Sequence, residues 1–270
     1  MKNYKHLILL TIACLTVFTL TSGKAYATAR VLEYDLVVDD NHSYTVNVDT
    51  NSDIDSESWS QLTEIDYTLT YTVDEDNGDG SFDVYATQTN GTITKDSGTP
   101  DAMTNGSDTQ IMNTGRGRVL HPIEAELLLP DQDANWNWGS VPGDTTGPFI
   151  STAVDVNDTW TQTFVYQPYN QSSQNVNVSC KLEEWTTLNG YNVAKIKRTW
   201  TEPMSGINTN SEPDETMSGN ISVTEYWWFA YDENILVKSE TTKTGSLDYA
   251  QGSEKQLDID TTIVTTVELN

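Results

Sequence analysis

Five side chains with oxygen donors lie close together between positions 74 and 83. They are Asp74, Asp76, Asn77, Asp79 and Asp83. Carboxylate and amide oxygens are the ligands that a hard cation such as Ca²⁺ takes in proteins. Gly78 stands where a third alternating ligand would be expected, so the spacing matches no standard calcium-binding loop. Two interpretations follow, a Ca²⁺ site and an acidic turn in contact with water.

A second group of candidates is aromatic. Trp136 and Trp138 lie in a segment rich in Pro and Gly, and Tyr226 and Trp228 alternate in an apolar run. Their flat rings could bind a lipid tail or a sugar ring. The alternative is that these side chains fill an ordinary core. We take all four as candidate ligand-binding residues.

Catalytic and zinc chemistry have little support in the sequence. After removal of the predicted leader only His42, His121 and Cys180 remain as His and Cys side chains. A structural zinc site takes four ligands and a catalytic one three, and no Gly-x-Ser-x-Gly elbow is present. With 40 acidic residues, some pair of carboxylates will always have the spacing of a glycosidase site, so such a pair has no diagnostic value. The sequence predicts no enzyme and no cofactor apart from the possible Ca²⁺.

Residues 1–27 have the pattern of a signal peptide. Lys2 and Lys5 precede an apolar run from Leu7 to about Leu20, and small residues occupy positions 25 and 27. We expect an exported chain that begins at Thr28 and is secreted, periplasmic or held at the cell surface. Lipidation at Cys14 is an alternative. No later segment is apolar enough to cross a membrane as a helix.

The predicted mature chain is strongly acidic. Three of the 14 basic residues lie in the leader, so 11 remain against 40 acidic ones, a net charge of about −29. A surface of this charge repels nucleic acid and anionic lipid, and we set both aside as partners.

These candidate side chains must be positioned by β-strands. Apolar residues alternate with polar ones in segments near 30–38, 44–48, 62–73, 82–86, 150–156, 160–166, 176–182, 193–200, 221–231, 235–240 and 257–269. We expect residues 28–270 to form a single all-β domain, a large antiparallel meander curled into a barrel or half-barrel, with a β-sandwich as the alternative. Long polar loops are predicted near 95–117, 130–148 and 202–219.

The segment from Tyr226 to Glu240 predicts a central hairpin with its turn at Asp232, Glu233 and Asn234. Both faces of its first strand are apolar over residues 226–230. Either a further layer covers both faces, or one face lines a cavity or groove.

Three landmarks resemble exported β-rich domains of unknown function, which are distantly similar to half-barrel carriers of lipoproteins and lipids. The landmarks are the hairpin 79–84, the turn and strand 157–160, and the aromatic hairpin 226–239. The resemblance implies a curved sheet with an apolar concave face and brings no catalytic residue with it.

Three functions follow as hypotheses. The first is an exported, non-enzymatic protein that binds an apolar or amphipathic ligand on an aromatic concave face. The partner expected from the aromatic candidates is an apolar or glycan ligand. The second is an acidic structural or adhesive module of the cell surface, stabilised by Ca²⁺. The third is an enzyme that acts on polysaccharide.

Overall fold

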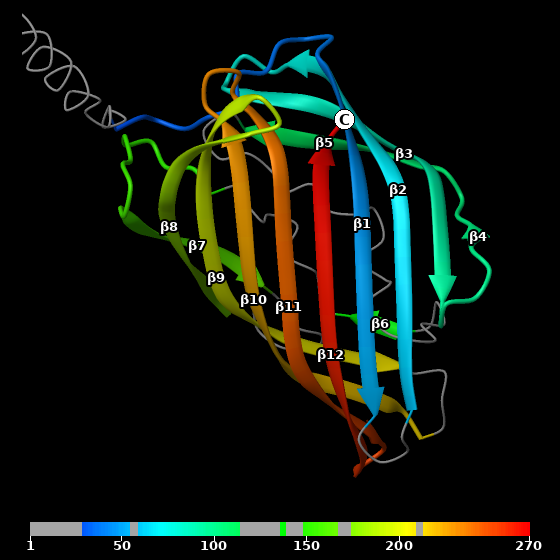
Figure 1. Ribbon diagram of the computed structural model, residues 1–270. Helices are drawn as coiled ribbons and strands as arrows, with labels where there is room; N and C mark the ends of the chain where they lie inside the picture. Colours follow the sequence, from blue (N-terminus) through cyan, green and yellow to red (C-terminus); the bar gives the residue numbers. More distant parts are fainter. Residues whose placement is uncertain (1–28, 55–58, 114–135, 139–147, 167–173, 209–212) are drawn as a thin grey trace, which may run out of the picture.

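The computed structural model describes residues 29–54, 59–113, 136–138, 148–166, 174–208 and 213–270 (Figure 1). All regular structure in these residues is β. The strands are β1 (Asn41–Ile54), β2 (Trp59–Asp76), β3 (Ser81–Lys95), β4 (Asp101–Ala102), β5 (Gly106–Asn113), β6 (Trp136–Trp138), β7 (Thr159–Tyr166), β8 (Gln174–Leu188), β9 (Tyr191–Asn208), β10 (Glu215–Ala230), β11 (Ile235–Gln251) and β12 (Glu254–Leu269).

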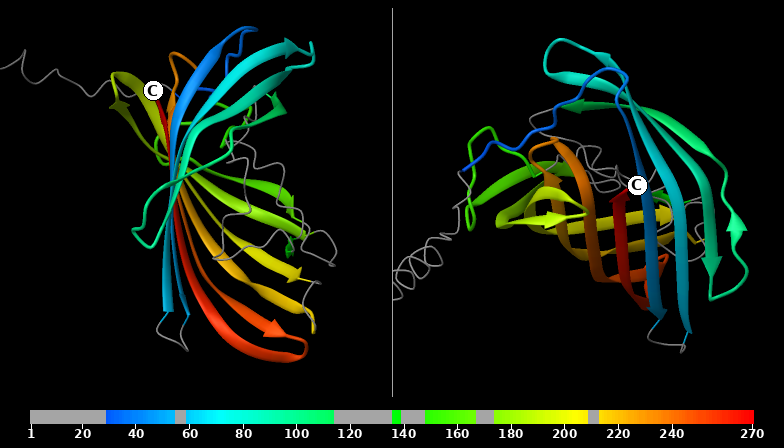
Figure 2. Two further views of the ribbon diagram at one scale, coloured as in Figure 1. Left: turned by 90° about the vertical axis from the view of Figure 1, so that its right-hand side faces the viewer. Right: turned by 45° about the horizontal axis from the view of Figure 1, so that its top comes forward.

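These strands form one antiparallel sheet of 12 strands. The main path runs in the order β4-β3-β2-β1-β12-β11-β10-β9-β8-β7, while β5 pairs with β3 and β6 with β9. The expected all-β antiparallel meander is confirmed. The sheet is curled but does not close into a barrel, and no second sheet of a sandwich is present in the described residues (Figure 2).

Period-two alternation explains why these segments are strands. In β2 every odd-numbered residue from Ile65 to Val73 is buried, while the even-numbered residues between them are exposed or half-buried. Successive side chains of a strand point to opposite faces, so this pattern presents one apolar face for burial. The same rule divides the whole sheet into a core face, defined by Trp227 and Phe229, and an outer face, defined by Tyr226 and Trp228.

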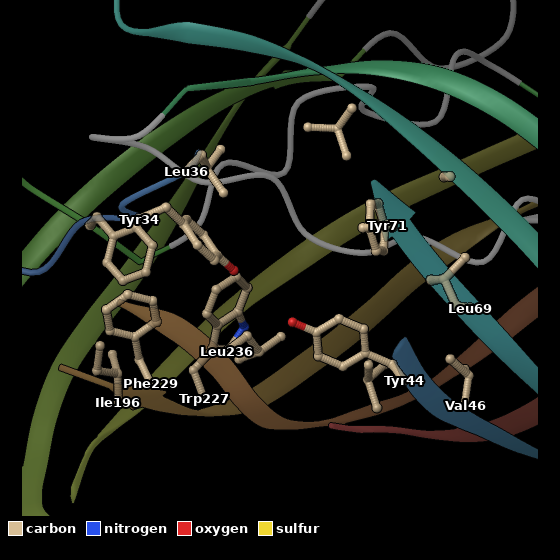
Figure 3. Packing of buried hydrophobic residues seen from close by; sticks show 14 of the residues in the cluster. Tyr34, Leu36, Tyr44, Val46, Leu69, Tyr71, Ile196, Trp227, Phe229 and Leu236 are labelled. Carbon is tan, nitrogen blue, oxygen red and sulfur yellow. The ribbon is translucent and has the colours of Figure 1, made fainter. Parts of the chain in front are cut away.

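Aromatic rings fill the core face (Figure 3). Phe149 lies 5.5 Å from Tyr34, 5.9 Å from Trp227 and 4.7 Å from Phe229 between ring centroids. All four side chains are buried. Edge-to-face and tilted pairs at these distances are the preferred arrangements of aromatic rings. This part of the concave face is therefore packed with the protein's own side chains.

The segment 30–38 is not the strand that its alternation predicted. Only Arg30 makes a bridge, with Val154, although Leu32, Tyr34 and Leu36 are buried in the core. The alternation arises because an extended segment that lies across the core face buries every second side chain, as a strand does.

The predicted polar loops also differ from the structure. Strands β4 and β5 lie within the segment 95–117, and β9 and β10 extend well into the segment 202–219. Most of their residues are polar or glycine, so no apolar alternation marked them, but their backbones pair with neighbouring strands. Of the segment 130–148, the structure describes β6 and Pro148.

The predicted signal peptide and Cys14 lie outside the described residues. Among the residues that are described, no helix has the length and apolar character needed to cross a membrane.

Candidate functional site

Tyr226 and Trp228 lie together on the outer face of β10. Their ring centroids are 6.1 Å apart and the ring planes are inclined by 38°. Both side chains are half-buried. From the sequence, we expected this pair on the concave face. The structure places it on the opposite face, because Trp227 and Phe229 occupy the core side of the same strand.

Lysine side chains surround the aromatic pair. Lys195 and Lys197 lie on β9 opposite Trp228 and Tyr226, and Lys238 lies on β11 opposite Trp228. The ammonium nitrogen of Lys195 is 5.1 Å from the Tyr226 ring and 5.5 Å from the Trp228 ring. Lys197 is 5.7 Å from Tyr226, and Lys238 is 5.6 Å from Trp228. At these distances an ammonium group is attracted to the negative face of an aromatic ring.

A fourth lysine extends this group onto β8. Lys181 lies directly opposite Lys197 in the register of β8 and β9. Like charges in directly opposed positions destabilise a sheet. We call Lys181, Lys195, Lys197, Lys238, Tyr226 and Trp228 the outer patch.

The ion pairs of the outer patch are unevenly distributed. Lys195 lies 3.7 Å from Glu183 and 3.8 Å from Glu184, and Lys238 lies 2.7 Å from Glu240. Lys181 and Lys197 make no ion pair with any carboxylate of the described residues. Two neighbouring cations that make no ion pair within the described part of the chain stand out in a protein with 40 acidic residues.

The outer patch continues into a groove of about 670 Å³. Its lining comes from β8, β9 and β10 and consists of Gln174, Asn175, Val176, Asn177, Ser179, Thr199, Trp200, Thr201, Pro203, Asn220, Ser222, Val223 and Thr224. None of these residues is charged. Ser179, Thr199 and Thr224 form the row next to Lys181, Lys197 and Tyr226, so the groove begins where the lysines end.

The tip of the β8–β9 hairpin closes the other end of the outer patch. Val193, Ala230 and Val237 form a small buried cluster on the outer face, with Leu188 and Tyr191 packed against it. The Asn189 side chain donates a hydrogen bond of 2.8 Å to Glu268 on β12, so the tip reaches across the outer face (Figure 1). This second apolar layer explains why both faces of β10 are apolar near residue 230.

The tryptophans of β6 are not part of the outer patch. Trp136 pairs with Asn208 and Trp138 with Gly206 through the backbone, and their side chains lie outside the described residues. Gly206 is nine residues along β9 from Lys197, a separation of roughly 30 Å at the rise of a strand. The four predicted aromatic residues therefore do not converge on one site.

The acidic hairpin between β2 and β3 forms the predicted turn. Gly78 and Gly80 adopt positive φ values of 74° and 86°. The Asp79 carboxylate accepts hydrogen bonds from the hydroxyl and backbone amide of Ser81, which lowers the pKa of Asp79.

The other donors of this hairpin also have local partners. Asn77 donates to Asp83, and Asp76 accepts from the Gly78 amide. Asp74 lies on β2 among the exposed residues. In the described part of the chain, no group of three or more His, Cys, Asp or Glu residues is arranged to hold a metal ion.

A buried polar cluster lies on the core face and was not expected from the sequence. Arg198 donates to Glu225 at 2.7 Å, with only 1% and 2% of the two side chains exposed, and Thr241 donates to Glu225 at 3.2 Å. Burial raises the pKa of the nearby Cys180 thiol to about 11, and Arg198 partly offsets that shift. Arg198, Glu225 and Thr241 are register partners, so the cluster ties β9, β10 and β11 together one row from Lys197 and Tyr226.

The lysines of the outer patch were also missed. A compositional signal existed, because Lys181, Lys195, Lys197 and Arg198 supply four basic residues within 18 positions of an acidic chain. Their convergence with Tyr226 depends on the register between β9 and β10, which the sequence alone did not reveal.

No model of a known protein family matches the chain, and no curated protein is significantly similar to it in sequence. Solved structures with a related fold include a provisionally assigned lipoprotein from Parabacteroides distasonis. It is 13% identical with a TM-score of 0.35, and the match covers 89% of this chain and 100% of that one. Another is a provisionally assigned exported protein with a YmcC-like fold from Bacteroides fragilis. It is 12% identical with a TM-score of 0.28, and the match covers 89% of this chain and 98% of that one. The resemblance to exported β-rich proteins expected from the sequence is thus present, and it concerns the fold alone.

Proposed function

We propose that the chain is an exported, non-enzymatic binding protein whose ligand lies on the outer patch. The observation that carries this proposal is the meeting of an aromatic pair with four lysines on one face of an acidic protein. Export follows from the predicted signal peptide. The ligand is anionic and has a flat apolar face, because those two features complement ammonium groups and aromatic rings.

Because the core face is packed, we place the ligand on the outer face and not on the concave face that the sequence suggested. Tyr34 and Phe149 cover Trp227 and Phe229, so an apolar ligand would have to displace buried aromatic rings there. Removing such a ring from a core costs about 3–5 kcal/mol. The outer patch needs no such displacement, since Tyr226 and Trp228 are already half-exposed.

Binding without catalysis fits the groove beside the outer patch. Glycoside hydrolysis uses two carboxyl groups on either side of the scissile bond. The described lining residues carry hydroxyl, amide and apolar groups instead of carboxylates. These groups can hold and orient a ligand by hydrogen bonds.

Binding by the outer patch can be tested on surfaces that carry different ligands. The mature protein and a Tyr226→Ala/Trp228→Ala variant are applied to immobilised anionic glycans, anionic lipids and their neutral counterparts. A Tyr85→Ala variant is the control, because Tyr85 is an exposed tyrosine on β3. We expect the native protein and the control to bind at least one anionic ligand and the double variant to lose that binding. Equal binding of neutral and anionic ligands by all three proteins would contradict the proposal.

A further inference from the structure

The groove next to the outer patch has the shape and chemistry of a site for a chain-like ligand. From Trp228 to Asn220 the outer face of β10 extends over eight residues, roughly 26 Å at the rise of a strand. Over this distance the surface changes from lysines and aromatic rings to hydroxyl and amide groups. A compact ligand would occupy one of these zones, whereas an extended ligand contacts both.

We propose that this strip binds one strand of an acidic polysaccharide, a polymer whose sugar units carry carboxylates. The inference rests on the proposed function and specifies its ligand. Lys181 and Lys197 bind the sugar carboxylates, Tyr226 and Trp228 pack against the C–H face of a sugar ring, and the groove accepts the following units. Ser, Thr and Asn side chains there can both donate to and accept from sugar hydroxyls.

The opposed lysines favour an anion between them. Lys181 and Lys197 face each other without an ion-pair partner in the described residues. A bound carboxylate removes the repulsion between them and forms charge-assisted hydrogen bonds, which are stronger than neutral ones. Lys195 and Lys238 are already paired with glutamates, so they hold the aromatic rings in place and contribute less to the recognition of charge.

The negative charge of the protein favours a single anionic strand over an extended anionic surface as the ligand. An extended anionic surface, such as a membrane, would bring its charge close to many of the 40 acidic residues of the chain. Screening in physiological salt confines such repulsion to about 8 Å, so a single polysaccharide strand in an uncharged groove experiences little of it.

Calorimetric titration with oligogalacturonate tests this inference. The comparison probe is the same oligosaccharide with its carboxyl groups reduced to alcohols, and the other probes are vesicles of anionic phospholipid and a single-stranded DNA oligomer. We expect oligogalacturonate to bind, and the reduced form to bind about a hundredfold more weakly, since each lost charge-assisted contact costs roughly tenfold. Affinity for oligogalacturonate should fall as salt is added.

Two variants locate the site. Lys181→Gln/Lys197→Gln should weaken binding of oligogalacturonate by about a hundredfold. The matched control Lys95→Gln/Lys255→Gln removes the same charge from exposed positions elsewhere and should leave the affinity unchanged. Thr201→Trp, which fills the groove without a change of charge, should weaken binding of long oligomers and spare the disaccharide.

The outcomes separate the inference from the proposed function. If the vesicles or the DNA bind at the outer patch and oligogalacturonate does not, the ligand class is wrong and the proposed function stands. If the reduced oligosaccharide binds as tightly as the charged one, or if Thr201→Trp binds long oligomers normally, the inference is overturned. If no anionic probe binds the native protein, both proposals fail.

Discussion

The buried ion pair between Arg198 and Glu225 gives the sharpest test of how the sheet is held in register. Both side chains are almost fully buried, and Nη1 of Arg198 lies 2.7 Å from Oε2 of Glu225. Arg198→Met leaves the Glu225 carboxylate in the core without its partner, and breaking a buried pair in this way costs about 3–5 kcal/mol. In a chain of this size each kcal/mol lowers the melting temperature by about 2–4 °C, so the expected shift is roughly 6–20 °C.

A second variant separates the loss of the partner from the loss of the side chain. Arg198→Met/Glu225→Leu removes both charges, and we expect it to recover most of the lost stability, because apolar replacements of a buried pair are often neutral or stabilising. Urea denaturation of native, single and double variants gives the free energies of unfolding. Lys255→Met, which removes exposed ion pairs with Asp248 and Asp258, should leave the unfolding midpoint unchanged. A single variant as stable as the native protein, or a double variant no better than the single one, would refute the reasoning.

Three further predictions concern the core face of the sheet. Burial raises the pKa of Cys180 to about 11, so the thiol should resist alkylation at pH 8 in the native protein and react quickly in urea. Because the folded state favours the neutral thiol, its contribution to stability is present below pH 9 and is lost as pH rises to 11; thermal melts should show a steeper fall over that range than in Cys180→Ala. A Cβ at Gly219 would clash with the Ser246 carbonyl oxygen, so Gly219→Ala should cost about 1–3 kcal/mol in urea denaturation, and the neighbouring exposed Ser218→Ala close to nothing. Tyr34→Ala should cost about 3–5 kcal/mol, because it removes the ring that packs on Phe149 and Phe229; a loss under 1 kcal/mol would show that segment 30–38 does not stabilise the core.

Most of the sheet could be predicted because its apolar side chains alternate. Strand β2 and the hairpin of β10 and β11 follow directly from that pattern. Asn234 at the hairpin turn has a positive φ of 59°, which Asn tolerates. The pattern fails where a segment alternates without pairing to a strand, or pairs without alternating. Segment 30–38 alternates without joining the sheet, whereas Thr241–Gln251 of β11 pairs on both sides with little apolar alternation.

The residues of the candidate site could be predicted only in part. Tyr226 and Trp228 were identified as ligand-contacting candidates from their aromatic character, and they lie at the centre of the outer patch. Their lysine neighbours were not identified, because Lys181, Lys197 and Tyr226 are far apart in the sequence and meet through the pairing of three strands. The face was also assigned wrongly, since the sequence does not show which side the Tyr34 segment covers.

Lysine reactivity in the presence and absence of ligand tests the central claim most directly. The mature protein is treated briefly with an acetylating reagent, and the rate at each lysine is measured by mass spectrometry with and without saturating oligogalacturonate. The account predicts that acetylation of Lys181 and Lys197 slows by about tenfold or more, while the exposed Lys95 and Lys255 react at unchanged rates. Equal rates at Lys181 and Lys197 in both conditions, or protection spread evenly over all four lysines, would contradict it.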